Sequence, residues 1–255
     1  MSDKAAKPTG SAASVAGSEL GYGLRFLRKH GLRILLVFFG VLLPLWGFAG
    51  LVDELREQEV FFFDIPVMLA LHKMATPGVD AFFVLMSKLG YLWGVLPLDV
   101  GIIGWLIWRR RFRDGLFFGL AIVGSLILNL AAKNHFTRIR PDLWLSLQPE
   151  TTFSFPSGHA MGSVTLCVAL VLLLWPTRWR WWVLIAASSF VLLVGMSRIY
   201  LGVHYPSDIL AGWTAGTAWV MAMYQLVASR APPPPAGPKV AAGPDLIAEA
   251  KKTKS

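Results

Sequence analysis

Six long apolar runs alternate with short polar or basic segments along this chain. Each run has roughly the length of a helix that crosses a bilayer, about 20 residues. The runs cover approximately residues 32–52, 91–108, 115–132, 159–175, 181–196 and 208–227. The pattern therefore predicts an all-α, polytopic membrane protein, a helical bundle with six transmembrane helices.

The segments outside these runs divide the rest of the chain. Residues 1–20 and 230–255 are rich in small, polar or Pro residues and lack apolar periodicity, so we predict disordered tails flanking a membrane domain at 21–229. The first run follows a basic flank, as a signal peptide would, but it is longer and lacks a small-residue cleavage site, which favours a retained helix. Between 53 and 88 the apolar stretches are too short to span, which is typical of interfacial or re-entrant helices.

The basic residues predict the orientation. Most of the 24 Lys and Arg lie in the N-terminal region, at 109–113, at 178–180 and in the C-terminal tail. By the positive-inside rule these segments face the cytoplasm, so both termini are expected there. Counting six spans from that side, the polar junctions at 133–140, 156–159 and 198–208 all emerge on the extracytoplasmic face.

Composition narrows the class of protein. The chain is 55% hydrophobic and 15% charged, with a mean hydropathy of +0.56, which argues against a soluble enzyme. A net charge of +9 could suit nucleic acid, but the charges stand at the ends of apolar runs rather than on a binding face, and we expect no nucleic-acid partner. The single cysteine, Cys167, lies inside an apolar run and so predicts neither a disulfide framework nor a cysteine metal site.

A polar turn at residues 153–160, Phe-Ser-Phe-Pro-Ser-Gly-His-Ala, runs directly into the fourth apolar run. Ser157 is a good N-cap, and Gly158 and His159 then fall in the first helical turn, where backbone N–H groups lack partners and attract anions. His159 would lie beside a bound anion, well placed to protonate a leaving oxygen. In isolation the same four residues, Pro156 to His159, would indicate only an ordinary capped helix start.

Three basic residues at the neighbouring junctions change this interpretation. Lys133, Arg140 and Arg198 are predicted on the same face as the turn. Arginine suits bidentate contact with phosphate oxygens and lysine supplies a compact charge, so together they can balance the charge of a phosphate ester. The sequence offers no plausible cluster of carboxylates or thiols on that face, so we expect no metal and no cofactor. Arg138, in the same loop, is given no role.

His204 and Asp208 are four residues apart, with Pro206 between them at an expected helix entry. This spacing leaves the carboxylate within reach of the imidazole, where it would fix the tautomer and raise the basicity of the other ring nitrogen. His204 is therefore the better candidate nucleophile. His159, which has no acidic residue near it in sequence, is the better candidate proton donor.

The order and spacing of these residues resemble the three signature motifs of the type-2 phosphatidic acid phosphatase superfamily. Six residues separate Lys133 from Arg140-Pro141, residues 156–159 read Pro-Ser-Gly-His, and Ser197-Arg198 precedes the His204 and Asp208 pair. No signature position departs from the pattern, and the resemblance covers roughly residues 60–227.

The resemblance implies a mechanism with assigned roles. His204 would attack phosphorus and form a phosphohistidine, Asp208 would orient it, and His159 would protonate the departing oxygen before water regenerates the enzyme. The phosphate would be held by Lys133, Arg140, Ser157, Gly158 and Arg198.

The same resemblance implies a lipid substrate in a bacterial plasma membrane, such as phosphatidic acid, phosphatidylglycerophosphate or undecaprenyl diphosphate. Two other functions stay open from the sequence. One is a phosphotransferase that passes the same phosphoryl group to a hydroxyl, and the other is a non-catalytic binder or transporter of lipid phosphates. The sequence predicts neither whether monophosphate or diphosphate lipids are preferred nor the oligomeric state.

Overall fold

The computed structural model describes residues 30–57 and 61–228, and every regular element within those ranges is a helix. Both predicted tails, 1–20 and 230–255, lie outside the described residues. A first helix, His30–Arg56, contains the π-helical turn η1 (Phe38–Leu42) and continues as α2 (Leu43–Arg56). The elements that follow are α3 (Asp64–His72), α4 (Pro77–Leu89), α5 (Val95–Trp108), α6 (Phe112–Phe136), α7 (Gly158–Leu174), α8 (Arg180–Tyr200), α9 (Pro206–Met223) and the π-helical η2 (Tyr224–Ala228).

Each predicted apolar run corresponds to one of these helices, but the runs differ in their capacity to span. Among the residues that the structure describes, three helices are long and apolar enough to cross a membrane: His30–Arg56, Phe112–Phe136 and Arg180–Tyr200. Val95–Trp108 and Gly158–Leu174 are apolar but shorter, and α9 meets neither description. The prediction of an all-α membrane fold is therefore confirmed, while the number of six spans stays a prediction.

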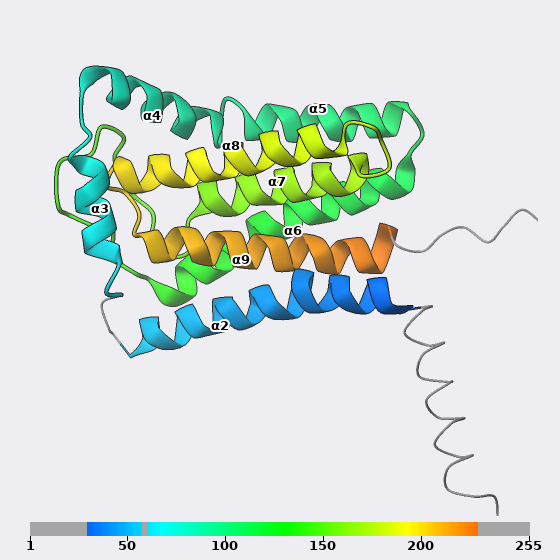
Figure 1. Cartoon of the computed structure of the whole chain (residues 1–255), viewed down its shortest axis with the longest axis horizontal. Helices are drawn as coiled ribbons and strands as arrows, with labels where there is room; N and C mark the ends of the chain where they lie inside the picture. Colours follow the sequence, from blue (N-terminus) through cyan, green and yellow to red (C-terminus); the bar gives the residue numbers. More distant parts are fainter. Residues whose placement is uncertain (1–29, 58–60, 229–255) are drawn as a thin grey trace, which may run out of the picture.

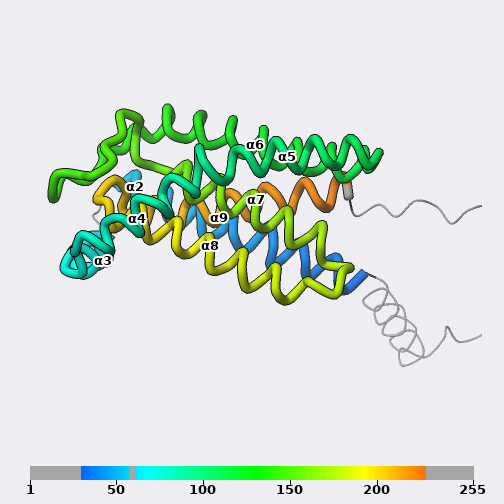
Figure 2. Tube along the Cα trace, turned by 90° about the horizontal axis from the view of Figure 1, so that it is seen from above, coloured from blue at the N-terminus to red at the C-terminus, as the bar shows by residue number. Residues whose placement is uncertain are grey.

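All helices except α3 run along the long axis of the molecule, and α3 lies across one end (Figure 1). Helices α6 and α8 finish at that end, and α7 and α9 begin there. The view from above agrees, with α3 at one end and the blue start of the first helix and the orange C-terminal end of α9 at the other (Figure 2). The three polar junctions of the sequence therefore gather at a single end of the bundle.

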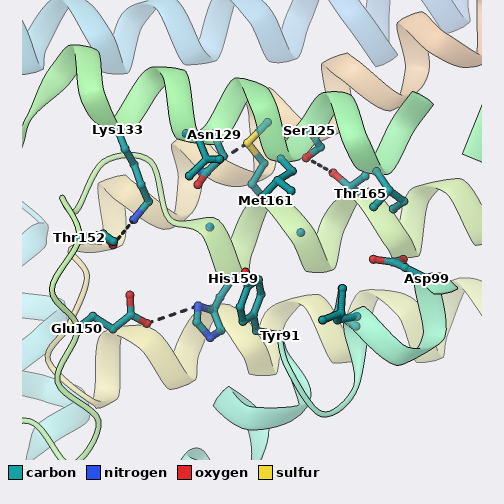
Figure 3. A pocket seen from close by; sticks show the side chains of 17 residues that line it. Tyr91, Asp99, Ser125, Asn129, Lys133, Glu150, Thr152, His159, Met161 and Thr165 are labelled. Carbon is teal, nitrogen blue, oxygen red and sulfur yellow. Dashed lines mark hydrogen bonds and ion pairs between the residues drawn. The ribbon is translucent and has the colours of Figure 1, made fainter. Parts of the chain in front are cut away.

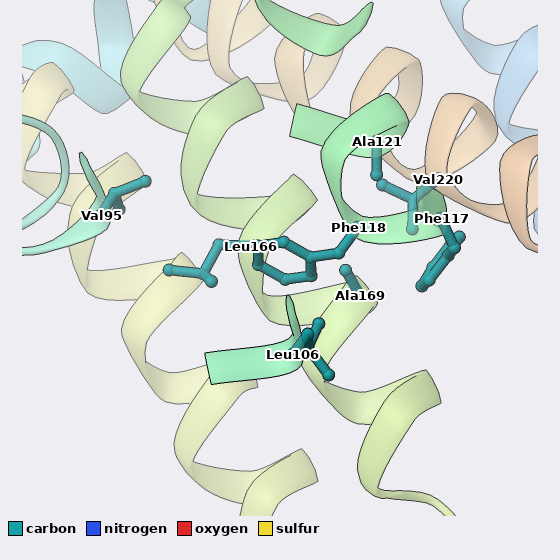
Figure 4. Close-up of a cluster of buried hydrophobic side chains, with 8 residues drawn as sticks. All are labelled: Val95, Leu106, Phe117, Phe118, Ala121, Leu166, Ala169 and Val220. Carbon is teal, nitrogen blue, oxygen red and sulfur yellow. The ribbon is translucent and has the colours of Figure 1, made fainter. Parts of the chain in front are cut away.

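Helix α7 occupies the middle of the bundle, where it packs against α6, α8 and α9. Its inner face contributes Leu166 and Ala169 to a buried cluster with Phe117 and Phe118 of α6 (Figure 4). Burial of such aromatic and aliphatic side chains within the bundle fixes α6 against α7. The ends of these two helices carry the first and second polar junctions, so their packing also fixes those junctions relative to each other.

Two glycines allow α9 to approach α7 closely. A Cβ atom at Gly212 would lie 2.8 Å from the backbone oxygen of Ser157, and one at Gly216 would lie 2.6 Å from a methyl carbon of Val164. Small residues permit such short backbone distances between membrane helices. The start of α7 is thereby held directly against the first turns of α9, which carry the third junction.

Candidate active site

His204 lies in the short connection between α8 and α9 and is completely buried. Its Nδ1 is 3.4 Å from Oδ2 of Asp208, and its Nε2 is 3.1 Å from a terminal nitrogen of Arg140. An arginine can only donate, so Nε2 must accept and the ring proton belongs on Nδ1, toward Asp208. This tautomer leaves the Nε2 lone pair on the side of the imidazole that faces the cations.

The surroundings of His204 also favour its neutral form. Burial lowers the pKa of His204 well below its ordinary value, and the charges of Arg140, Arg198 and Lys133 lower it further, against an opposing effect from Glu150. The imidazole is therefore unprotonated at neutral pH. An uncharged ring is the form of histidine that acts as a nucleophile, and its Nε2 lone pair can attack once Arg140 turns its hydrogen bond from Nε2 to a bound phosphoryl group.

Asp208 is buried at the start of α9 and is held by several donors. Its Oδ2 accepts from the backbone N–H of Tyr205 at 2.9 Å and from the hydroxyl of Ser154, while Oδ1 accepts from Arg138 at 2.6 Å. Each contact favours the carboxylate and opposes the cost of its burial. Ser154 also lies 3.3 Å from Nδ1 of His204, so it contacts both members of the pair.

Arg138, which the sequence left without a role, links Asp208 to a second buried carboxylate, Asp64 of α3. The guanidinium donates to Asp64 at 2.9 Å through one nitrogen and to Asp208 at 2.6 Å through the other. Asp64 in turn accepts from the backbone N–H of Ser207 at 2.9 Å and from its hydroxyl at 2.6 Å. These contacts hold α3 across the end of the bundle, against the start of α9.

Two of the expected phosphate ligands converge on one carboxylate. Arg140 donates to Oε2 of Glu150 at 2.8 Å, and Arg198, which is 1% exposed, donates to Oε1. The same Oε1 lies 3.7 Å from Nδ1 of His159. Burial opposes ionisation of Glu150, but the positive charges of Arg198, Arg140 and Lys133 outweigh it and lower the pKa of Glu150. Glu150 is therefore an anion in the place where the cations meet.

Lys133, Ser157 and Gly158 lie at the same end but have other partners in this structure. The Lys133 ammonium donates to the hydroxyl of Thr152 at 3.0 Å and to the carbonyl of Phe153 at 2.6 Å. The backbone N–H of Ser157 donates to the carbonyl of Asp208 at 3.1 Å, which joins the second junction to the third. That amide was expected to face an anion. A Cβ at Gly158 would lie 3.1 Å from an Asn129 oxygen, so the helix start has little room for a side chain.

A cavity of about 340 Å³ opens beside these residues and extends between α5, α6 and α7 (Figure 3). Lys133, Glu150 and His159 line its end at the polar junctions. A second hollow of about 310 Å³ shares Glu150 and His159 and is bordered by Lys88 and Trp93. Within the described ranges, no group of three or more His, Cys, Asp or Glu is arranged to hold a metal ion.

Comparison with known proteins identifies the family. The sequence profile of the PAP2 superfamily matches residues 114–232. Phosphatidylglycerophosphatase B of Bacillus subtilis is 33% identical over 174 residues, which are 66% of this chain and 85% of that protein. The chain belongs to the PAP2 superfamily. The match includes every candidate catalytic residue, and it confirms the resemblance seen in the sequence.

Other relatives agree with this assignment. This PAP2 chain is 29% identical over 214 residues to an undecaprenyl-diphosphatase of Sulfolobus acidocaldarius, covering 81% of this chain and 95% of that protein. The crystal structure of a transmembrane PAP2-type phosphatidylglycerolphosphate phosphatase from Bacillus subtilis matches with a TM-score of 0.62 and 28% identity, covering 72% of this chain and 94% of that one. The chain is thus an integral membrane phosphatase of this superfamily.

Sequence reasoning missed four residues of this site: Asp64, Arg138, Glu150 and Ser154. Glu150 left a signal, because it is the one glutamate in the loop between the first and second junctions. Ser154 lies next to the Pro-Ser-Gly-His turn and could have been weighed with it. Asp64 is more than 130 residues from its partner Ser207, and no local spacing connects the two.

Proposed function

We propose that this chain is a metal-independent lipid phosphatase that hydrolyses a phosphate monoester or diphosphate of a membrane lipid through a phosphohistidine on His204. The observation that carries the proposal is the buried, neutral imidazole of His204, whose Nε2 faces Arg140 beside the point where Arg140 and Arg198 bind one anion. Such an arrangement places a nucleophile next to the donors that phosphoryl transfer requires.

The reaction has two steps. In the first, Nε2 of His204 attacks phosphorus, the bond from phosphorus to the lipid oxygen breaks, and the imidazolium form of His159 gives its proton to that oxygen so that the lipid departs. In the second, His159 takes a proton from water, the water oxygen attacks phosphorus, and the bond to Nε2 breaks. Inorganic phosphate leaves and His204 returns to its starting form. Asp208 keeps the Nδ1 proton in place throughout.

The phosphoryl oxygens would be held by Arg140 and Arg198 in place of Glu150, with Lys133, the Ser157 hydroxyl and the Gly158 amide as further ligands. Arginine can bind two oxygens of a phosphoryl group at once, so its charge and geometry both favour the transition state. To bind the phosphate, the Lys133 ammonium would have to give up its hydrogen bonds to Thr152 and Phe153.

We infer that all six apolar helices span a bacterial plasma membrane, with both termini in the cytoplasm and His204 on the extracytoplasmic side. The structure supports this inference, because α6 and α8 end, and α7 and α9 begin, at the same end of the bundle. An even number of spans also returns the chain to the side of the membrane where it began. The basic segments at 109–113 and 178–180 lie at the opposite end, as the positive-inside rule requires. A lipid would then reach the site from within the bilayer, through the cavity of Figure 3.

Phosphate release without added metal tests this function directly. Purified protein in detergent should release inorganic phosphate from phosphatidic acid, phosphatidylglycerophosphate or a polyprenyl diphosphate. Activity should persist in EDTA, because fixed cations balance the charge, and orthovanadate should inhibit by occupying the phosphoryl site. Release of one phosphate per lipid consumed excludes transfer to a hydroxyl. A strict requirement for a divalent metal would contradict the proposal.

Replacing Glu150 with glutamine should strengthen anion binding. Its carboxylate uses the donors of Arg140 and Arg198 that a phosphoryl group needs, so substrate and orthovanadate must displace it. Without the charged carboxylate, orthovanadate has a weaker competitor for the two arginines. We therefore expect its inhibition constant to be about tenfold lower. The inhibition constant is measured with purified Glu150→Gln protein against wild type.

Asp142→Asn is the matched control for that variant, since Asp142 is an exposed acid of the same loop. It removes the same charge without touching the two arginines. If Glu150→Gln and Asp142→Asn alter vanadate inhibition equally, the effect is one of general charge and Glu150 does not compete for the site.

A further inference from the structure

The cavity beside the active site contains polar side chains far below the polar junctions. Along α6, Ser125, Asn129 and Lys133 are four residues apart and all line the cavity. Residues at this spacing share one face of a helix, and each step covers about 6 Å of its axis. The polar stripe therefore extends about 12 Å from Lys133 toward the membrane interior. Leu126 and Leu130, which also line the cavity, make the rest of its wall apolar.

The deep end of this stripe faces two further polar groups. Ser125 shares a hydrogen bond of 2.8 Å with Thr165 of α7, and Asp99 of α5 lines the same space (Figure 3). In a bonded pair of hydroxyls one hydrogen is shared between them, and the second is available to another acceptor. The pair can thus donate to a group inside the cavity.

Asp99 is the most unusual of these groups. Its side chain is 5% exposed, and its Oδ1 has no hydrogen-bond partner among the described residues. An unpaired polar atom in apolar surroundings costs free energy, and an acidic residue within a membrane helix usually marks a functional site. A buried carboxyl without a cationic partner is neutral, and no such partner of Asp99 occurs among the described residues. Its O–H can therefore donate to an acceptor of a lipid bound in the cavity that leads to His159.

We propose that this cavity recognises acyl lipids, whose ester or amide carbonyls accept hydrogen bonds from the Asp99 carboxyl, Ser125 and Thr165 while the phosphate lies at His204. The proposal rests on the proposed function, since it assigns the substrate class of that same site. A glycerophospholipid with a phosphorylated headgroup carries oxygen atoms over much of the length of this polar stripe, which is about 12 Å. A polyprenyl diphosphate presents only hydrocarbon beyond its two phosphates, and it would leave these polar groups unpaired.

The test compares two substrates that differ only in this region. Phosphatidylglycerophosphate with ester-linked chains and the same lipid with ether-linked chains share phosphate, glycerol and chain length. Wild-type protein should prefer the ester lipid in kcat/KM by about tenfold, the scale of one good hydrogen bond. The preference should fall toward equality in Asp99→Leu, whereas Asp99→Asn, which still forms hydrogen bonds, should keep most of it.

Ser125→Ala provides a second variant, so that a misfolded Asp99→Leu would not end the experiment. It should reduce the ester preference in the same direction. Lipid-induced shifts in thermal unfolding of the purified proteins give a binding comparison that needs no turnover. The inference is overturned if wild type binds and hydrolyses both lipids equally, if the preference survives in Asp99→Leu and Ser125→Ala, or if a polyprenyl diphosphate has the higher kcat/KM. Ester-selective binding without phosphate release from any lipid would contradict the proposed function alone.

Discussion

His204→Ala is expected to abolish phosphate release, with kcat/KM lowered by about 10⁴-fold or more, the scale on which enzymes lose activity without their nucleophile. Neither Asp208 nor Arg140 can replace the imidazole, because the carboxylate is directed at Arg138 and Ser154 and a guanidinium has no lone pair to offer. Release of inorganic phosphate from a lipid phosphate measures the loss.

The fold should tolerate this substitution. Asp208 keeps its bonds from Tyr205, Ser154 and Arg138 when the imidazole is removed. His135→Ala is the matched control, since His135 is an exposed histidine at the same end of the bundle, one residue before the end of α6. It should retain wild-type turnover. Substantial turnover by folded His204→Ala protein would eliminate this residue as the nucleophile.

Arg198→Lys should lower kcat/KM by about 10²-fold, although the charge is retained. Arg198 is buried at the last turn of α8, where its two terminal nitrogens reach Ser87 and Glu150. A lysine ammonium cannot reproduce this fork, so one contact to the phosphoryl oxygens is lost in the transition state. Steady-state kinetics with a lipid phosphate measure the change.

Arg180→Lys tests whether the effect is specific to the site. Arg180 is exposed at the opposite end of the same helix, so its replacement should leave kinetics unaltered. Thermal unfolding of both variants separates loss of catalysis from loss of fold. Equal kinetics for Arg198→Lys and wild type would show that a point charge suffices and that bidentate binding plays no part.

The helices were predictable because hydrophobicity along this chain is strongly segmented. The runs at 115–132 and 181–196 became α6 and α8, and each helix continues four residues beyond the end of its run. Polar residues such as Lys133 and Arg198 belong to the last turns of those helices, where an apolar run no longer signals a helix. The number of spans is less predictable, because α5 is short and α9 has a modest hydropathy.

The arrangement of the candidate site was predictable only in part. His204 and Asp208 are four residues apart, so their contact follows from local geometry. The contacts of Asp64 with Arg138 and Ser207 depend instead on how α3 crosses the end of the bundle, which no periodicity specifies. Glu150 belongs to an irregular loop, and only the positions of the two arginines reveal that its carboxylate lies between them.

The covalent intermediate is the most direct test of the proposed mechanism. Rapid quenching of purified protein with a lipid labelled in its phosphate should trap one phosphoryl group per active site, bonded to His204 and labile in acid but stable in base. Mass spectrometry locates it, and His204→Ala should carry none. Multiple turnovers without any labelled protein, or a label on another residue, would contradict the account.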